Sequence, residues 1–267
     1  MGKPRARMTE ESKPAEPLAE QPLVAHLLEL RDRLLRIVLG IIVCVLPMVP
    51  FAQELFALLA EPLLAQMPEG TSMIATEVAS PFLTPFKLAL LVAIVISMPW
   101  SLYQIWAFVA PGLYMHERRF ALPLVASSTV LFYLGMAFAY FVVFPLIFGF
   151  FLSAAPAGVT VMTDIGRYLD FVITLFLAFG AAFEVPVAIV LMVRMGLTTP
   201  CALREKRAYV LVGAFTIGML LTPPDIFSQT LLALPVYILY ELGILAAMVL
   251  VPGSREVDAQ RREQAKP

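Results

Sequence analysis

Positive charges are segregated along this chain. Of its 19 lysine and arginine residues, seven precede the first long apolar run and ten fall in three later polar segments, at 118–119, 194–207 and 255–266. Only Lys87 and Arg167 lie elsewhere. The apolar stretches between the basic segments are long enough to cross a bilayer, and the polar segments on their other side carry almost no positive charge. This pattern predicts a multi-span membrane protein whose basic segments all lie in the cytoplasm.

Composition supports the same class and argues against catalysis. Hydrophobic residues make up 60% of the chain and charged residues 15%, whereas soluble domains carry about 25% charged residues. The two cysteines, Cys44 and Cys201, offer neither a disulfide framework nor metal-ligand spacing. There is no phosphate-binding loop, and the His-Glu-Arg-Arg sequence at 116–119 lacks the second histidine of a zinc HExxH site. We expect no enzyme activity, no metal or other cofactor, and no nucleic-acid partner.

The chain is predicted to be an all-α integral membrane protein with six transmembrane helices. Residues 1–22 are too poor in apolar side chains to bury a core and are expected to form a disordered cytoplasmic tail. Leucines at 23, 27, 30 and 34 recur at helical spacing and predict an amphipathic helix on the membrane surface that leads into the first span. The membrane domain is expected over 23–251, followed by a cytoplasmic tail at 252–267. Because the number of spans is even, both termini lie in the cytoplasm. The six spans are expected at about 34–52, 88–109, 120–152, 171–193, 208–221 and 226–251.

The predicted spans differ in length. The third has 33 residues, about 50 Å as a helix, and must tilt, bend or protrude; Pro145 and Gly149 offer a bend. The fifth has 14 residues, about 21 Å, and is stopped by the prolines at 223–224. The last two helices are therefore expected to form a short hairpin that thins the bilayer or admits water. Residues 53–85 are expected to form a structured cap on the outer surface.

Few ionisable residues fall within the apolar spans. Lys87 can reach the outer surface with its long side chain, and Glu241 lies nearer the inner end than the middle of its span. Glu184 reaches neither surface easily, so it should face protein or a water-filled cavity. Two interpretations of Glu184 stay open: a functional carboxyl, and a protonated structural carboxyl that is hydrogen-bonded to a neighbouring helix.

Two carboxylates stand out on the basic, cytoplasmic side. Glu29 lies beside Arg31, and Glu117 immediately precedes Arg118 and Arg119 at the start of the third span. Each could simply neutralise the arginine beside it. Alternatively, two carboxylates on one membrane face could bind a paired guanidinium ligand, because arginine binds a carboxylate through two parallel hydrogen bonds.

Five segments of the chain form a set of motifs in a fixed order. They are His26–Arg33, Met73–Phe82, Gln104–Tyr114, Phe183–Val187 and Gly218–Asp225. Together they resemble the TatC family, the multi-spanning receptor subunit of the twin-arginine protein translocase. The resemblance runs from about Pro22 to Val251.

The resemblance implies a function for particular residues. It implies export of folded proteins across the bacterial cytoplasmic membrane, driven by the proton-motive force, with the single-span subunits TatA and TatB as partners and self-association in the receptor complex. Asp32 stands where relatives commonly have a basic residue, and we assign it no role. By the resemblance, signal-peptide binding falls to Glu29, Glu117, Arg31, Phe108, Pro111, Leu113, Tyr114, Arg118 and Arg119; an intramembrane role to Glu184; partner docking to Met219, Thr222 and Gln229; and transport on the outer side to Pro62, Phe82 and Asp225.

The predicted shape is a concave, cupped bundle without an aqueous pore of its own. Its few polar intramembrane residues cannot line a pore for folded cargo, so transport must need other subunits. The alternative function is a proton-coupled small-solute transporter with Glu184 as the proton carrier. That function predicts polar residues from several spans at the bilayer midplane, whereas the sequence places essentially one carboxyl there.

Overall fold

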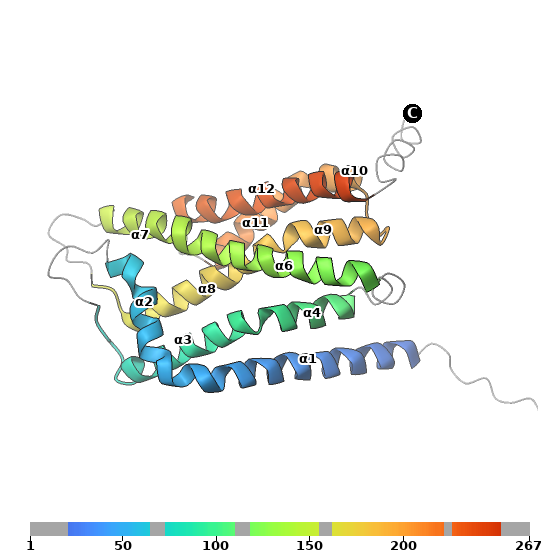
Figure 1. Ribbon diagram of the computed structural model, residues 1–267. Helices are drawn as coiled ribbons and strands as arrows, with labels where there is room; N and C mark the ends of the chain where they lie inside the picture. Colours follow the sequence, from blue (N-terminus) through green and yellow to red (C-terminus); the bar gives the residue numbers. More distant parts are fainter. Residues whose placement is uncertain (1–20, 65–72, 110–117, 155–161, 222–225, 252–267) are drawn as a thin grey trace, which may run out of the picture.

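The computed structural model of this chain is all-helical (Figure 1) and describes residues 21–64, 73–109, 118–154, 162–221 and 226–251. An isolated bridge between Ile74 and Asp164 joins two of its connecting segments. The helical elements, in chain order, are α1 (Gln21–Met48), a 3-10 turn (Val49–Phe51), α2 (Ala52–Leu64), α3 (Ser80–Ile96), α4 (Met98–Val109), α6 (Arg118–Phe138), a π-helical turn (Ala139–Val143), α7 (Phe144–Ser153), α8 (Ile165–Phe183), α9 (Val185–Arg194), α10 (Pro200–Glu205), α11 (Arg207–Leu221) and α12 (Ile226–Leu250).

Within the described residues, four helices or near-continuous helix runs are long and apolar enough to cross a membrane. They cover 24–61, 122–151, 165–194 and 226–250, and the bent pair of α3 and α4 adds a fifth if it counts as one span. Helix α11, with 15 residues, is apolar but shorter. The chain is therefore an all-helical, multi-span membrane protein.

Prolines account for the places where the long spans bend. A proline removes a backbone donor, and its ring clashes with the carbonyl group four residues earlier. Pro99 follows the 57° bend between α3 and α4, and Pro186 follows the break between α8 and α9. Pro145 follows the π-helical turn at 139–143. The third span is thus irregular in the turn before Pro145, and a bend at Pro145 and Gly149 stays a prediction.

The first two spans begin differently from the prediction. Helix α1 is one continuous helix with no break near Leu34, so the segment expected on the membrane surface and the first span belong to the same helix. Its leucine spacing continues into the apolar stretch without an intervening glycine or proline until Gly40, and nothing ends the first segment. Leu35, Leu39 and Leu46 are more than half exposed, as expected for a helix that faces lipid. The second span begins at Ser80 and not at Leu88, because Pro81 lies in the first turn of α3, where its missing donor costs no helical hydrogen bond.

The expectation of two short final helices holds only for α11. Helix α12 has 25 residues, about 37 Å, and Pro235 lies within it without ending it. The turn at 222–225, which was expected to stop the fifth span, lies outside the described residues. Of the last two helices, only α11 is therefore shorter than the hydrocarbon thickness of a bilayer.

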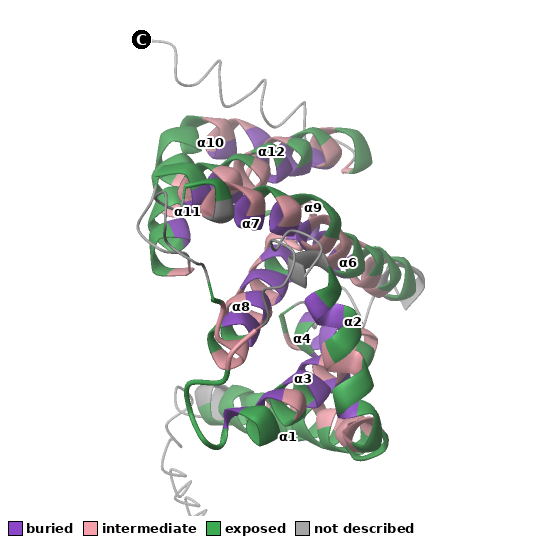
Figure 2. Ribbon diagram, turned by 90° about the vertical axis from the view of Figure 1, so that its left-hand side faces the viewer, coloured by how far each residue is buried: buried purple, intermediate pink, exposed green. Residues whose placement is uncertain are grey.

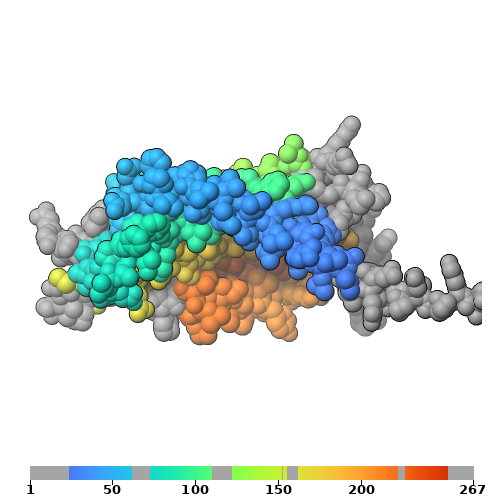
Figure 3. All heavy atoms as spheres, turned by 90° about the horizontal axis from the view of Figure 1, so that it is seen from below, coloured from blue at the N-terminus to red at the C-terminus, as the bar shows by residue number. Residues whose placement is uncertain are grey.

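Helix α8 lies at the centre of the packing. Its side chains Leu169, Val172, Leu175 and Phe179 are fully buried, and Figure 2 shows α8 between α1 and α3 on one side and α11 and α12 on the other. Helix α6 packs on α8, and α12 packs on α9 and α11. Seen from below, α1 and α3 border one side of the exposed face and α11 borders the other (Figure 3).

The crossing of α6 and α8 is unusually close because glycine occupies both helices. A Cβ atom on Gly135 would lie 2.5 Å from the Phe179 carbonyl oxygen, and a Cβ atom on Gly180 would lie 2.5 Å from Cε2 of Phe132. Both distances are far below van der Waals contact, so only glycine fits at either position. The same crossing brings an earlier turn of α6, at Ser128, against the break between α8 and α9.

Candidate functional site

The predicted site residues fall at three levels of the bundle, and some lie outside the described residues. Helix α1 begins, and α4, α9 and α12 end, at one end of the molecule (Figure 1), here called the basic end because it carries Arg31, Arg33, Arg36, Arg194 and Arg204. Glu29, Arg31 and Phe108 are described at this end. Glu117, Pro111, Leu113, Tyr114, Thr222 and Asp225 lie outside the described residues, as do the side chains of Pro62, Arg118 and Arg119.

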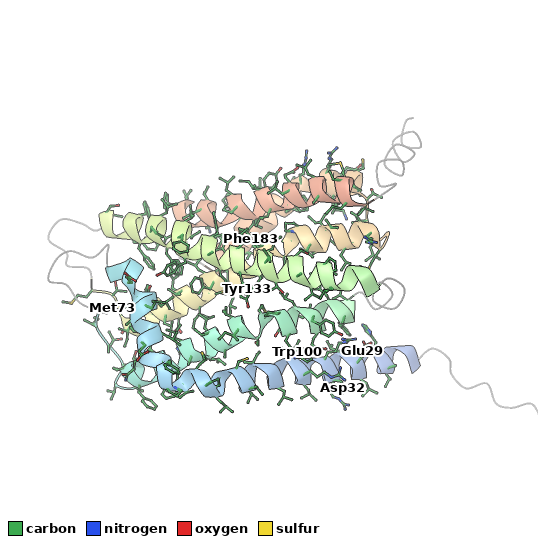
Figure 4. The ribbon with its side chains drawn as sticks, in the orientation of Figure 1. Glu29, Asp32, Met73, Trp100, Tyr133 and Phe183 are labelled. Atoms are coloured by element: carbon green, nitrogen blue, oxygen red, sulfur yellow. The ribbon has the colours of Figure 1, made fainter. Side chains whose placement is uncertain are left out.

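Glu29 lies between α1 and α4 (Figure 4) and is held by Arg33. The Arg33 guanidinium donates to Glu29 Oε1 through Nη2 at 2.6 Å and through Nε at 2.9 Å. It also donates to Oε1 of the buried Gln104 on α4 at 3.4 Å. Arg31 instead bonds Asp32 at 2.8 Å, so the residue that orients Glu29 is Arg33 and not Arg31.

Ring stacking and a backbone contact fix the register of α1 against α4. His26 stacks on Phe108 with ring centroids 4.4 Å apart, and the Trp100 indole donates to the Arg36 carbonyl oxygen at 3.0 Å. A shallow open hollow beside Glu29 is lined by Ala25, Leu28, Glu29, Asp32, Arg33 and Arg36. The chain leaves this surface at the end of α4 and reaches Glu117 eight residues after Val109. The site therefore offers an oriented carboxylate next to an exposed helix surface and an aromatic ring.

Glu184 lies at the break between α8 and α9, ten residues before Arg194. That separation is about 15 Å along a helix, or half of a bilayer's hydrocarbon thickness of about 30 Å. The Ser128 hydroxyl on α6 donates to Glu184 Oε2, and the Trp106 indole on α4 donates to Ser128 Oγ at 2.7 Å. Glu184 Oε1 is buried and has no hydrogen-bond partner among the described residues. Glu184 is thus linked through Ser128 to α6 and through Trp106 to α4. Its second oxygen, Oε1, forms no hydrogen bond with the described residues.

At the opposite end, Asp164 ties the segment before α3 to the start of α8. Its carboxylate accepts hydrogen bonds from the backbone and hydroxyl of Thr76 at 2.8 and 2.7 Å, and from the backbone of Gly166 and Arg167 at 2.9 Å each. These hydrogen bonds, led by those from Arg167 and Thr76, lower the pKa of Asp164 from 3.8 to about 2. Lys87, which was expected to reach the outer surface, pairs there with Asp170 of α8 at 2.8 Å.

The remaining predicted residues lie near α11, α12 and the start of α3. Met219 is half exposed, and the backbone of Gln229 lies against Gly218, where an added Cβ would be 3.6 Å from the Gln229 carbonyl oxygen. Glu241 pairs with Arg207 at 2.5 Å, consistent with a structural role. Phe82 is two-thirds exposed and contacts the Phe86 ring at a centroid distance of 4.8 Å.

Sequence reasoning missed several residues that hold these groups. Ser128 and Trp106 were not identified because a serine or a tryptophan in an apolar span carries no periodic signal of its partner. Arg33 could have been found, because it lies four residues after Glu29, the spacing at which helical side chains pair. Asp164 could have been recognised by its residue type, because aspartate is a favoured N-cap residue and it directly precedes α8.

Comparison with known proteins identifies the family. The family model described as Sec-independent protein translocase protein (TatC) matches residues 25–235. The TatC protein of Escherichia coli strain K12 is 59% identical over 235 residues, covering 88% of this chain and 91% of that protein. The TatC protein of Haemophilus influenzae is 54% identical over 246 residues, covering 92% of this chain and 96% of that protein.

A solved structure agrees with the same assignment. A crystal structure of the twin-arginine translocase receptor TatC superposes with a TM-score of 0.76 at 37% identity, covering 84% of this chain and 98% of that one. The resemblance read from the five motifs is confirmed. The chain therefore belongs to the TatC family and is a membrane protein-transport receptor of the twin-arginine translocase, not an enzyme.

Proposed function

We propose that this chain binds twin-arginine signal peptides on the cytoplasmic face of the bacterial cytoplasmic membrane. In this proposal it crosses the membrane six times with both termini in the cytoplasm, associates with itself and with TatA and TatB, and exports folded proteins using the proton-motive force. Glu29 and Glu117 bind the two guanidinium groups of the signal peptide. Phe108, Pro111, Leu113 and Tyr114 supply apolar contact beside them.

The distribution of charge supports this orientation. Arg33, Arg36, Arg194, Arg204 and Lys206 all lie at the basic end. At the opposite end most of the described charged residues are carboxylates, among them Glu54, Glu61, Glu77, Asp164 and Asp170. Basic segments stay on the cytoplasmic side of a membrane, so the basic end is the cytoplasmic one.

The observation that carries the proposal is the placement of Glu29. It lies at the basic end, oriented by Arg33 and next to the end of α4, from which the chain continues toward Glu117. A carboxylate oriented in this way suits a planar guanidinium, which donates two parallel hydrogen bonds. The intrinsic pairing with Arg33 also means that a signal-peptide arginine must share or replace an existing partner, which favours an exchange of ion pairs over a permanent contact.

Charge reversal tests the proposal. Glu29→Lys and Glu117→Lys should each reduce cross-linking of a twin-arginine signal peptide at least tenfold, because hydrogen bonds to charged groups contribute about 1.5–3 kcal/mol each and 1.4 kcal/mol is a factor of ten. Insertion and thermal stability should stay close to wild type, since Glu29 lies in the cytoplasmic part of α1.

Asp32→Lys is the matched control. It makes the same change of charge on the same helix, and Asp32 is engaged by Arg31. It should weaken cross-linking by less than threefold. Undiminished cross-linking in the double Glu29→Lys, Glu117→Lys variant, or an equal loss in Asp32→Lys, contradicts the proposed site.

A further inference from the structure

The first link of the hydrogen-bond chain that reaches Glu184 has a fixed direction. An indole N–H can donate but cannot accept, so Trp106 must donate to Ser128, at 2.7 Å. The single proton of the Ser128 hydroxyl is then directed to Glu184 Oε2. In this arrangement Oε2 accepts from Ser128.

The neighbouring serine shows that this contact is specific. Ser127 lies one residue earlier on α6, and its hydroxyl donates to the Leu124 carbonyl of its own helix at 2.9 Å. Ser128 is fully buried, whereas Ser127 is exposed. Of these two adjacent serines, only Ser128 donates to the Glu184 carboxyl group, whereas Ser127 donates within its own helix.

An apolar cluster encloses the chain of hydrogen bonds. Leu102, Trp106, Phe132, Val187 and Leu191 pack together around it and are each at most 7% exposed. Phe132 lies one turn after Ser128 and contacts Gly180, one turn before Glu184. In surroundings of this kind hydrogen bonds are strong, and an unpaired polar atom is costly.

We propose that Ser128 and Trp106 are positioning residues that hold the Glu184 carboxyl by Oε2 and leave Oε1, which has no hydrogen-bond partner among the described residues, for a hydrogen-bonding group of a partner. This inference deepens the proposed function, since it rests on a role of Glu184 in transport. When Glu184 is protonated, its proton lies on Oε1, or on Oε2 with Ser128 Oγ as the acceptor. When it is ionised, Oε1 is the oxygen that accepts from an incoming donor. A partner group that engages Glu184 without displacing Ser128 therefore does so through Oε1.

Infrared spectroscopy of the purified protein in lipid tests the arrangement directly. The Glu184 carboxyl band is the one that Glu184→Gln removes. Ser128→Ala should move this band to higher wavenumber, because the Oε2 carbonyl loses its donor. Trp106→Phe should give a smaller shift of the same sign, and Ser128→Thr, which keeps the hydroxyl group, should restore most of the wild-type position. The matched control Ser127→Ala should leave the band unchanged. An unmoved band in Ser128→Ala, or an equal shift in Ser127→Ala, overturns the proposal.

Tryptophan fluorescence gives a second readout that does not depend on a carboxyl band. The chain has two tryptophans, so Trp100→Phe leaves Trp106 as the sole emitter. Adding Ser128→Ala removes the acceptor of the indole N–H and should shift the emission to shorter wavelength, while adding Ser127→Ala should not. Identical emission in the two serine variants contradicts the hydrogen bond.

The proposed role of Glu184 in transport and the positioning role of Ser128 and Trp106 are tested separately. Ser128→Ala and Trp106→Phe should reduce transport while signal-peptide cross-linking persists. If Glu184→Gln transports at the wild-type rate, the proposed role of Glu184 is wrong even though the band shift holds. If the band does not respond to Ser128→Ala while Glu184→Gln blocks transport, the positioning role is wrong and the function of Glu184 stands.

Discussion

The close crossing of α6 and α8 makes a quantitative prediction about two glycines. Gly180→Ala places a methyl group 2.5 Å from Cε2 of Phe132, and Gly135→Ala places one 2.5 Å from the Phe179 carbonyl oxygen and 2.9 Å from its carbon. Carbon atoms in contact lie about 3.5–4.0 Å apart. Each substitution therefore demands a displacement of roughly 1 Å in a packed interior.

The obstacle differs between the two sites, and so does the expected loss of stability. The Phe132 ring is 2% exposed and cannot turn out to solvent, but a side chain can shift slightly, so Gly180→Ala should cost about 1–3 kcal/mol. At Gly135 the obstacle is backbone, which moves only if the helices separate. Gly135→Ala should therefore cost about 3 kcal/mol or more, and it should also draw Ser128 away from Glu184.

Gly213→Ala is the matched control, because no atom lies within 4 Å of an added Cβ at this position of α11. In thermal unfolding in detergent, Gly135→Ala should have the lowest melting temperature and Gly180→Ala the next lowest. Gly213→Ala should melt at or above the wild-type temperature, because alanine has a higher helix propensity than glycine. The two destabilised variants should lose transport at temperatures where they remain folded. Equal melting temperatures for all three variants would refute the account of the crossing.

Three further expectations concern pH, Glu184 and α11. Folding lowers the pKa of Asp164 from 3.8 to about 2, so its hydrogen bonds with Thr76 are complete above about pH 4 and are lost as pH falls toward 2. Hydrogen exchange of the Thr76 amide can follow this loss. In Asp164→Asn the same amide should exchange rapidly at every pH. Glu184→Gln should retain folding and partial transport, whereas Glu184→Ala should lose more because it leaves a cavity and an unpaired Ser128 hydroxyl; equal loss in a transport assay would indicate that ionisation of Glu184 is required. Lengthening α11 by one apolar turn, about 5.4 Å, should reduce transport without reducing signal-peptide cross-linking, and transport at the native rate would exclude a role for its shortness.

The long helices could be predicted from the sequence because apolar runs of membrane-spanning length leave the backbone few alternatives. The depth of Glu184 followed from its place within such a run. Bends were harder to place. Pro145 marked a distortion, but a proline disturbs the turn that precedes it, and the structure accordingly places the π-helical turn at 139–143.

The partners of the candidate carboxyls could not be predicted to the same extent. Glu184 and Ser128 are 56 residues apart in the sequence, and their contact depends on the crossing that Gly135 and Gly180 permit. No local pattern encodes that crossing. Glu29 shows the opposite case: proximity in sequence suggested Arg31, but a helix brings residues four apart together, and Arg33 is the partner.

The central claim is that this chain recognises paired arginines, and the most direct test is equilibrium binding of a signal peptide to the purified protein in lipid nanodiscs. A lysine cannot reproduce the two parallel hydrogen bonds of a guanidinium group. We therefore expect a twin-arginine peptide to bind at least tenfold more tightly than its twin-lysine variant, and Glu29→Lys to abolish the difference. Equal affinity for the two peptides, combined with proton-coupled uptake of a small solute by the chain alone, would contradict the claim and favour a transporter.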